Sequence, residues 1–138
     1  MKTKLPKGYK PSPDEKFMNE SQTIYFRKKL LDWKEEILLD SKETLNHLQE
    51  DSQKEPDIAD RASSETDWSV ELRTRDRQRK LITKIDAAID RIKNGEYGFC
   101  EVSGEPINLD RLDARPIAMM SLEAQEEHEK YEKVHRDN

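Results

Sequence analysis

A single break between two long, charge-rich helical stretches constrains this chain more than any other feature of its sequence. No glycine or proline occurs in residues 14–55, and Pro56 then disfavours helical geometry at Glu55. Apolar residues recur at spacings of three and four on both sides of the break, which is the period of a helix. Only 33% of residues are hydrophobic and 40% are charged. This composition suits helices that each bury one narrow stripe, and it predicts a long antiparallel helical hairpin.

The first long helix has a predicted start and a predicted buried stripe. Asn19 is typical of an N-cap, and Gln22 three residues later would complete a capping box. The buried stripe is expected at Phe26, Leu30, Trp33, Ile37, Thr44 and Leu48.

The second helix is expected to start between Ser63 and Asp67 and to end at Lys93. Asn94-Gly95 supplies the stop, because glycine readily adopts the left-handed conformation that closes a helix. The buried stripe is expected at Trp68, Leu72, Ile82, Ile85, Ile89 and Ile92. Since the two helices have nearly equal lengths, we expect them to pair antiparallel as a coiled coil.

The remaining residues are expected to form a small globular head. Two short apolar pieces around a Ser-Gly turn favour a β-hairpin within 95–107, and Ser121 suits the N-cap of a charged C-terminal helix. The predicted fold is mainly α. Its segments are an extended or disordered arm at 1–15, a helical part packing on the head at 16–32, the coiled-coil hairpin at 33–94 with its tip near 53–66, and the head at 95–138.

Charge and cysteine content exclude several classes of protein. The formal net charge of −5 argues against a general nucleic-acid binder, and no sequence-specific DNA binding is expected. No apolar stretch approaches the roughly 20 residues that cross a bilayer, and the basic start lacks the apolar core of a signal peptide. The single cysteine, Cys100, excludes an internal disulfide framework and fits a reducing cytosol. We expect a cytoplasmic monomer.

Two acids lie at the bend of the predicted hairpin, Asp57 and Asp60. A thin hairpin cannot bury its own tip, so these carboxylates would be displayed to a partner. They could engage basic groups of a deep site or approach a bound Mg²⁺, and the sequence does not choose between the two. Capping the second helix or holding the turn is the other interpretation, and the residues alone favour it.

A stripe of basic residues follows one face of the second helix. Arg73, Arg77, Lys80 and Lys84 are spaced four, three and four residues apart. Such a stripe can grip phosphate, since arginine offers planar, paired hydrogen bonds. A solvated face paired with acids of the neighbouring helix is the alternative, and composition alone favours it.

Four ordered motifs give the chain a resemblance to a known family. They are Asp57-x-x-Asp60-x-Ala62, ELRTRDRQRKLI at 71–82, GEYGFCE at 95–101 and RLDARP at 111–116. Together they resemble the DksA family of bacterial RNA polymerase-binding transcription factors. Met18-Asn19-Glu20, Phe26-Arg27 and Trp33 extend the resemblance, which covers roughly residues 16–130.

The resemblance implies a function and its residues. Family members insert the coiled-coil tip into the secondary channel of RNA polymerase and destabilise open promoter complexes, usually with the alarmone ppGpp; they are not enzymes. The matching tip residues are Asp57, Asp60 and Ala62, and the positions matching a ppGpp site are Arg77, Leu81 and Lys84. A further basic residue of familiar members corresponds here to Gln125, which leaves the strength of the ppGpp response open.

The resemblance also exposes a departure at the family's four-cysteine zinc site. The corresponding positions are Cys100, Ser103, Ser121 and Ala124. A structural zinc ion takes four ligands, normally cysteine or histidine, so no zinc and no other bound cofactor is expected. Apolar packing would then hold the head together. The candidates are Phe99, Val102, Ile107, Leu109, Leu112, Ile117, Met119, Met120 and Leu122.

Two other functions fit the same pattern. A coiled-coil adaptor without a polymerase role would explain the helices and the charge. A factor that stimulates RNA cleavage by polymerase would also place acids on a coiled-coil tip. Intrinsic catalysis is not supported, because the three histidines and one cysteine lie at scattered positions without motif spacing.

Overall fold

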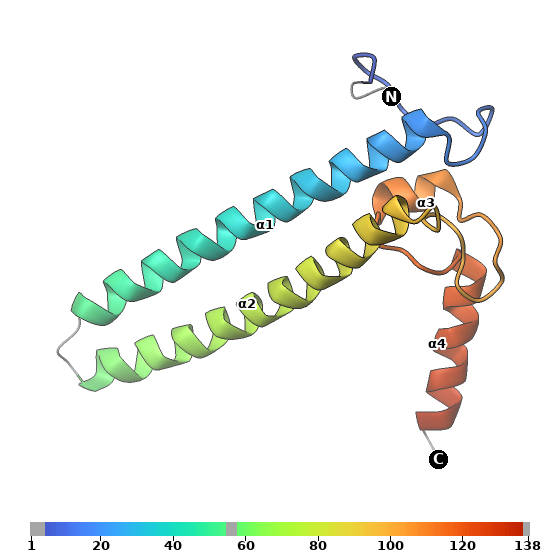
Figure 1. Ribbon diagram of the computed structural model, residues 1–138. Coiled ribbons are helices and arrows are strands. Elements are labelled where there is room, and N and C mark those ends of the chain that lie inside the picture. The colour runs from blue at the N-terminus through green and yellow to red at the C-terminus, as the bar shows by residue number, and fades with distance from the viewer. Residues whose placement is uncertain (1–4, 55–57, 137–138) are drawn as a thin grey trace. The chain divides into compact units, whose positions relative to one another are not determined.

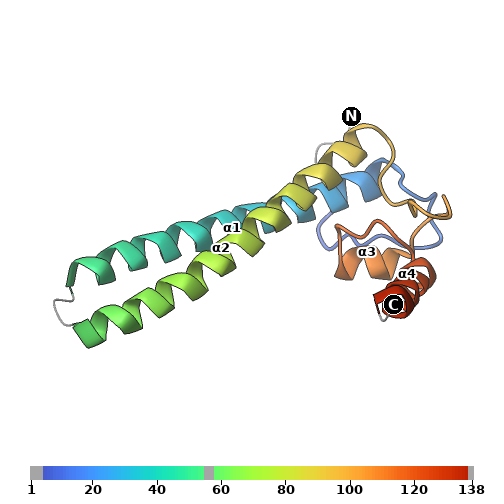
Figure 2. The ribbon, with the colours of Figure 1, turned by 90° about the horizontal axis from the view of Figure 1, so that it is seen from below.

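The computed structural model describes the backbone of residues 5–54 and 58–136. Side chains are described for the same residues except 47–64 and 136. Its helices are α1 (Glu20–Lys54), α2 (Ile58–Lys93), α3 (Leu109–Ala114) and α4 (Leu122–Arg136). Figures 1 and 2 show α1 and α2 side by side and antiparallel, which confirms the predicted mainly α fold. The chain divides into a head unit (Met1–Leu30 with Ala87–Asn138) and a hairpin unit (Leu31–Asp86), and each is described by itself.

The ends of the two long helices follow local capping. Asn19 Oδ1 accepts a hydrogen bond from the backbone N–H of Gln22 at 2.8 Å, as expected of an N-cap. The fully buried Gln22 side chain reaches back to the N–H of Met18, also at 2.8 Å, one residue earlier than a standard capping box. At its C-terminal end, α2 stops at Lys93 as predicted, and Gly95 has a φ of 76°.

The start of α2 corrects one prediction. The helix begins at Ile58, whereas the sequence indicated a start between Ser63 and Asp67. Proline restricts only the residue before it, and the good helix formers Ala59, Arg61 and Ala62 follow within the next turn. The helix can therefore begin within two residues of Pro56.

The hairpin unit is a thin structure with little buried surface. Among the side chains described at 31–46 and 65–86, only Ile37 and Ile85 are buried. Trp33, Thr44, Trp68 and Ile82 are half-buried, as members of the predicted stripes. Leu72 was wrongly placed in the stripe, because its side chain is 47% exposed and the half-buried residue beside it is Glu71.

The core of the head unit joins the start of α1 and the end of α2 to the C-terminal segment. Its buried side chains include Phe26, Leu30, Ala88, Tyr97, Ile107, Leu112 and Ile117. Of the predicted packing residues, Ile107, Leu112 and Ile117 are buried and Leu109 and Met120 are half-buried. Phe99, Val102, Met119 and Leu122 are exposed, so these four were wrong.

The predicted β-hairpin is reduced to one isolated bridge between Phe99 and Pro106 within the described chain. Proline has no N–H to donate, so the pairing cannot extend as a regular ladder at this position. The backbone instead turns tightly, with hydrogen bonds of 2.8 Å from Cys100 N–H to Glu105 O and from Gly104 N–H to Cys100 O.

The segment before α1 packs against this turn. Residues 5–18 form turns in which Tyr9 donates a hydrogen bond to the Glu15 carboxylate at 2.8 Å. Phe17 meets Phe99 edge-on with ring centroids 5.3 Å apart. Gly98 is required here, because its φ is 91° and a Cβ atom would lie 3.0 Å from the Phe17 ring.

Candidate functional site

The predicted acidic tip falls between the end of α1 at Lys54 and the first turns of α2. Asp57 falls outside the described residues. Asp60 and Ala62 lie in the first turns of α2, where the structure describes the backbone and not their side chains. An acid in the first turn of a helix interacts favourably with the helix dipole, so a capping role for Asp60 remains compatible with its position. The polymerase-contacting role of the three residues stays a prediction.

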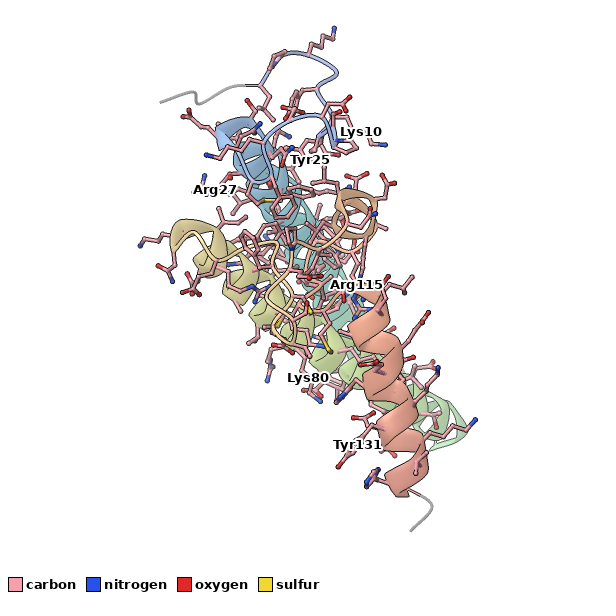
Figure 3. The ribbon with its side chains drawn as sticks, turned by 90° about the vertical axis from the view of Figure 1, so that its right-hand side faces the viewer. Lys10, Tyr25, Arg27, Lys80, Arg115 and Tyr131 are labelled. Atoms are coloured by element: carbon pink, nitrogen blue, oxygen red, sulfur yellow. The ribbon has the colours of Figure 1, made fainter. Side chains whose placement is uncertain are left out.

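The basic stripe lies on the solvent face of α2. Arg73, Arg77, Lys80 and Lys84 are all exposed, and Lys80 is labelled in Figure 3. Lys80 Nζ lies 3.2 Å from Asp76 Oδ2 in the next turn back along the helix, and Arg73 Nε donates to Ser69 O at 3.4 Å. Exposed pairs of this kind contribute little to stability, so the stripe remains open to a partner.

The predicted ppGpp residues share one side of α2. Arg77 and Lys84 are exposed, and Leu81 between them is half-buried. Two cations on one side of a helix can contact a phosphate group together. Gln125, in α4, donates to Glu129 Oε1 at 3.0 Å. The assignment to ppGpp stays a prediction.

Three of the four positions that match zinc ligands meet around the Cys100 sulfur. Cys100 is buried, with 2% of its surface exposed. Burial raises the pKa of the Cys100 thiol, but hydrogen bonds from the Ser103 hydroxyl and from the backbone N–H groups of Ser103, Ser121 and Val102 outweigh it and lower the pKa to about 6. The turn therefore offers a set of donors to one thiolate.

The fourth position, Ala124, joins this cluster through the start of α4. Ser121 Oγ accepts a hydrogen bond from Ala124 N–H at 3.2 Å, which confirms Ser121 as the cap of α4. One thiol, two hydroxyls and a methyl group do not match the ligands of a structural zinc ion. Within the described residues, no group of three or more His, Cys, Asp or Glu is arranged to hold a metal.

A polar cluster that the sequence did not reveal attaches α3 to α1. Asp113 Oδ1 accepts hydrogen bonds from Tyr25 Oη at 2.5 Å and from Lys29 Nζ at 2.6 Å. These bonds hold the pKa of the Asp113 carboxyl below its ordinary value, although burial opposes them. Tyr25 and Asp113 are 88 residues apart, so no local spacing links them. Tyr25 is labelled in Figure 3.

Further hydrogen bonds fix the connector from α3 to α4. Arg111 Nε donates to Met120 O at 2.9 Å, and the buried Tyr97 hydroxyl donates to Pro116 O at 2.7 Å. A pocket of the head unit lies along this connector and the start of α4. Its lining includes Asn108, Arg111, Arg115, Ser121 and Glu123.

Comparison with known proteins decides the family. The family model of the DnaK suppressor protein DksA N-terminal domain matches residues 22–92, and the model of the prokaryotic dksA/traR C4-type zinc finger matches residues 95–130. The chain belongs to the DksA family. This family consists of transcription factors and not of enzymes, so the expectation that the chain is not an enzyme is confirmed.

Several DksA relatives resemble the chain over most of its length. "RNA polymerase-binding transcription factor DksA" of Caulobacter vibrioides is 63% identical over 130 residues, which cover 94% of this chain and 92% of that protein. The proteins of the same name from Haemophilus influenzae and Escherichia coli K12 are 42% and 38% identical; the matches cover 85% and 83% of this chain and 81% and 76% of those proteins.

A solved structure supports the same fold. The structure of transcription factor DksA2 from Pseudomonas aeruginosa superposes with a TM-score of 0.79 at 38% identity, covering 85% of this chain and 90% of that one. No helix in the described part of the chain is both long and apolar enough to cross a membrane.

Proposed function

We propose that this chain regulates transcription initiation in the bacterial cytoplasm by binding RNA polymerase directly. The observation that carries the proposal is the 63% identity, over 94% of the chain, to a DksA protein whose name states that it binds RNA polymerase. In the proposed mechanism the tip with Asp57, Asp60 and Ala62 enters the secondary channel and alters the lifetime of promoter complexes, such as those at ribosomal RNA promoters. Two paired helices without a bulky tip domain suit a narrow channel.

An initiation assay tests this mechanism. Purified RNA polymerase and a ribosomal RNA promoter would be measured with the wild type, with Asp60→Asn, and with Asp90→Asn as a matched control. Asp90 is an exposed acid on the same helix, far from the tip in sequence. We expect the wild type and the control to reduce initiation, and Asp60→Asn to bind polymerase without this effect. A wild type that leaves initiation unchanged would point to an adaptor without a polymerase role.

A cleavage assay on stalled elongation complexes separates initiation control from cleavage stimulation. A factor that positions catalytic Mg²⁺ would accelerate shortening of the transcript. We expect no acceleration by this chain, and a rate increase that depends on Asp60 would replace the proposed mechanism.

We propose that ppGpp strengthens the effect through Arg77, Leu81 and Lys84. Exposed cations at positions 77 and 84 and the half-buried Leu81 support a phosphate-binding role at a shared surface with polymerase. The effect of ppGpp on initiation would be compared for Lys84→Ala and for Arg79→Ala, an exposed basic residue of the same helix outside this set. Lys84→Ala is expected to remove the ppGpp increment. Equal losses in both variants would indicate a nonspecific charge effect.

We propose that the head folds without zinc. The support is the donor set at the matching positions, in which one buried thiol is hydrogen-bonded by the surrounding turn. Metal analysis of the purified protein should find far less than one zinc per chain, and a chelator should leave the thermal unfolding midpoint unchanged. Stoichiometric zinc, or unfolding by the chelator, would contradict this part of the proposal.

A further inference from the structure

The inward positions of α2 change character along the helix. They follow strict alternating spacings of three and four residues, and all of them are buried or half-buried. These positions are Trp68, Glu71, Arg75, Gln78, Ile82, Ile85, Ile89 and Ile92. Isoleucine fills the four positions nearest the end of the helix, whereas three consecutive positions before them are polar. We call Glu71, Arg75 and Gln78 the polar seam.

One residue of α1 is hydrogen-bonded to the polar seam. The Ser41 hydroxyl donates a hydrogen bond to Gln78 Oε1 at 2.6 Å, across the two helices. Of the half-buried residues that follow on α1, Thr44 also carries a hydroxyl and Leu45 is apolar. The Ser41–Gln78 hydrogen bond thus joins the two helices at the polar seam, whereas Ile37 and Ile85 are buried apolar residues of the same unit.

One polar atom of the polar seam has no hydrogen-bond partner among the residues that the structure describes. Glu71 Oε2 is buried and makes no hydrogen bond within the described part of the chain. A buried acceptor without a partner loses its hydration and gains nothing in return, so it destabilises the closed pair of helices. Polar residues at inward coiled-coil positions likewise lower stability relative to apolar ones.

We propose that the polar seam allows α1 and α2 to separate locally around residues 38–46 and 68–80. We further propose that this separation is needed when the hairpin binds its partner. The functional half of this inference rests on the proposed binding to RNA polymerase. Segments that move on binding are drawn from the least stable part of a fold. A sequence under selection for stability alone would place apolar residues at these three positions, as it does from Ile82 onward.

Hydrogen exchange of the native protein tests the opening. Amides at 38–46 and 68–80 are expected to exchange at least about tenfold faster than amides at 22–30 and 84–92, after correction for intrinsic rates. Uniform protection along both helices would overturn the inference, whatever the protein does to transcription.

A stabilised variant tests the functional half. Ser41→Ala, Glu71→Leu and Gln78→Leu would be combined, with Thr83→Leu as control, because Thr83 is exposed on the same helix. The triple variant is expected to slow exchange at 68–80 by about tenfold and to reduce the affinity for polymerase by at least about threefold. The control should change neither.

Slower exchange with full polymerase affinity would overturn the functional half. The pair Ser41→Ala with Gln78→Leu, which removes one hydrogen bond and adds apolar contact, repeats the test if the triple variant does not fold. A wild type that does not bind polymerase would refute the proposed function while leaving the exchange result standing.

Discussion

Removing the Asp113 carboxylate should weaken the attachment of α3 to α1 by an amount that depends on pH. Asp113→Asn replaces a charged acceptor of two hydrogen bonds, from Lys29 and Tyr25, by a neutral one. Such bonds contribute about 1.5–3 kcal/mol each when buried. Since the side chains of Lys29 and Asp113 are 36% and 27% exposed, water screens part of this energy. We expect a loss of about 1–3 kcal/mol in total at neutral pH.

The direction of the pH dependence follows from the lowered pKa of Asp113. The unfolded chain binds a proton at this carboxyl more readily than the folded chain, so the stabilisation is complete above the ordinary aspartate pKa. It is lost as the pH falls from that value through the lower pKa of the folded state. The stability difference between wild type and Asp113→Asn should therefore shrink between pH 6 and pH 3.

Thermal unfolding followed by circular dichroism at both pH values measures this difference. At pH 6 the midpoint should fall by about 3–9 °C in Asp113→Asn. Asp110→Asn, an exposed acid on the same helix, serves as the control and should change the midpoint by no more than about 2 °C. An equal difference at pH 6 and pH 3 would refute the electrostatic reasoning, and no difference at pH 6 would refute the attachment itself.

Three other predictions concern packing and the thiol. Ile85→Ala should destabilise the chain by about 2–5 kcal/mol in urea unfolding, and Leu72→Ala by no more than about 0.5 kcal/mol, because only Ile85 is buried; similar losses would contradict the observed inward face. Gly98→Val should lower the thermal midpoint, since φ is 91° and Phe17 lies 3.0 Å from the added atom; an unchanged midpoint would show that the turn relaxes freely. The ultraviolet absorbance of the Cys100 thiolate should titrate near pH 6, and a midpoint near 9 would mean that the surrounding donors are not aimed at the sulfur.

Features set by neighbouring residues were predictable from the sequence. Asn19 and Ser121 cap their helices, and Asn94-Gly95 ends α2, because capping depends on a few adjacent backbone groups. The antiparallel pairing followed from the lengths of the two stretches and the single break between them. The matching zinc positions could be located by motif order, and three of them do meet around one sulfur.

Features that depend on partners distant in the chain were not predictable. Apolar periodicity indicated Leu72 as the inward residue, whereas the half-buried residue is Glu71; an inward position filled by a polar residue leaves no apolar signal in the sequence. The bonds of Asp113 to Tyr25 and Lys29 join segments with no common motif. The side chains of Val102 and Leu122 are exposed because of the orientation of the turn and of α4 within the head unit. Hydropathy alone does not specify that orientation.

The division into two units has a spectroscopic consequence. Both tryptophans of the chain, Trp33 and Trp68, belong to the hairpin unit, whereas the four tyrosines all belong to the head unit. Excitation at a wavelength that only tryptophan absorbs would therefore report on the hairpin unit alone. Tyrosine absorbance, with Tyr25 and Tyr97 in hydrogen bonds that unfolding breaks, would report on the head. Melting of the two units can be followed separately in the same unlabelled sample.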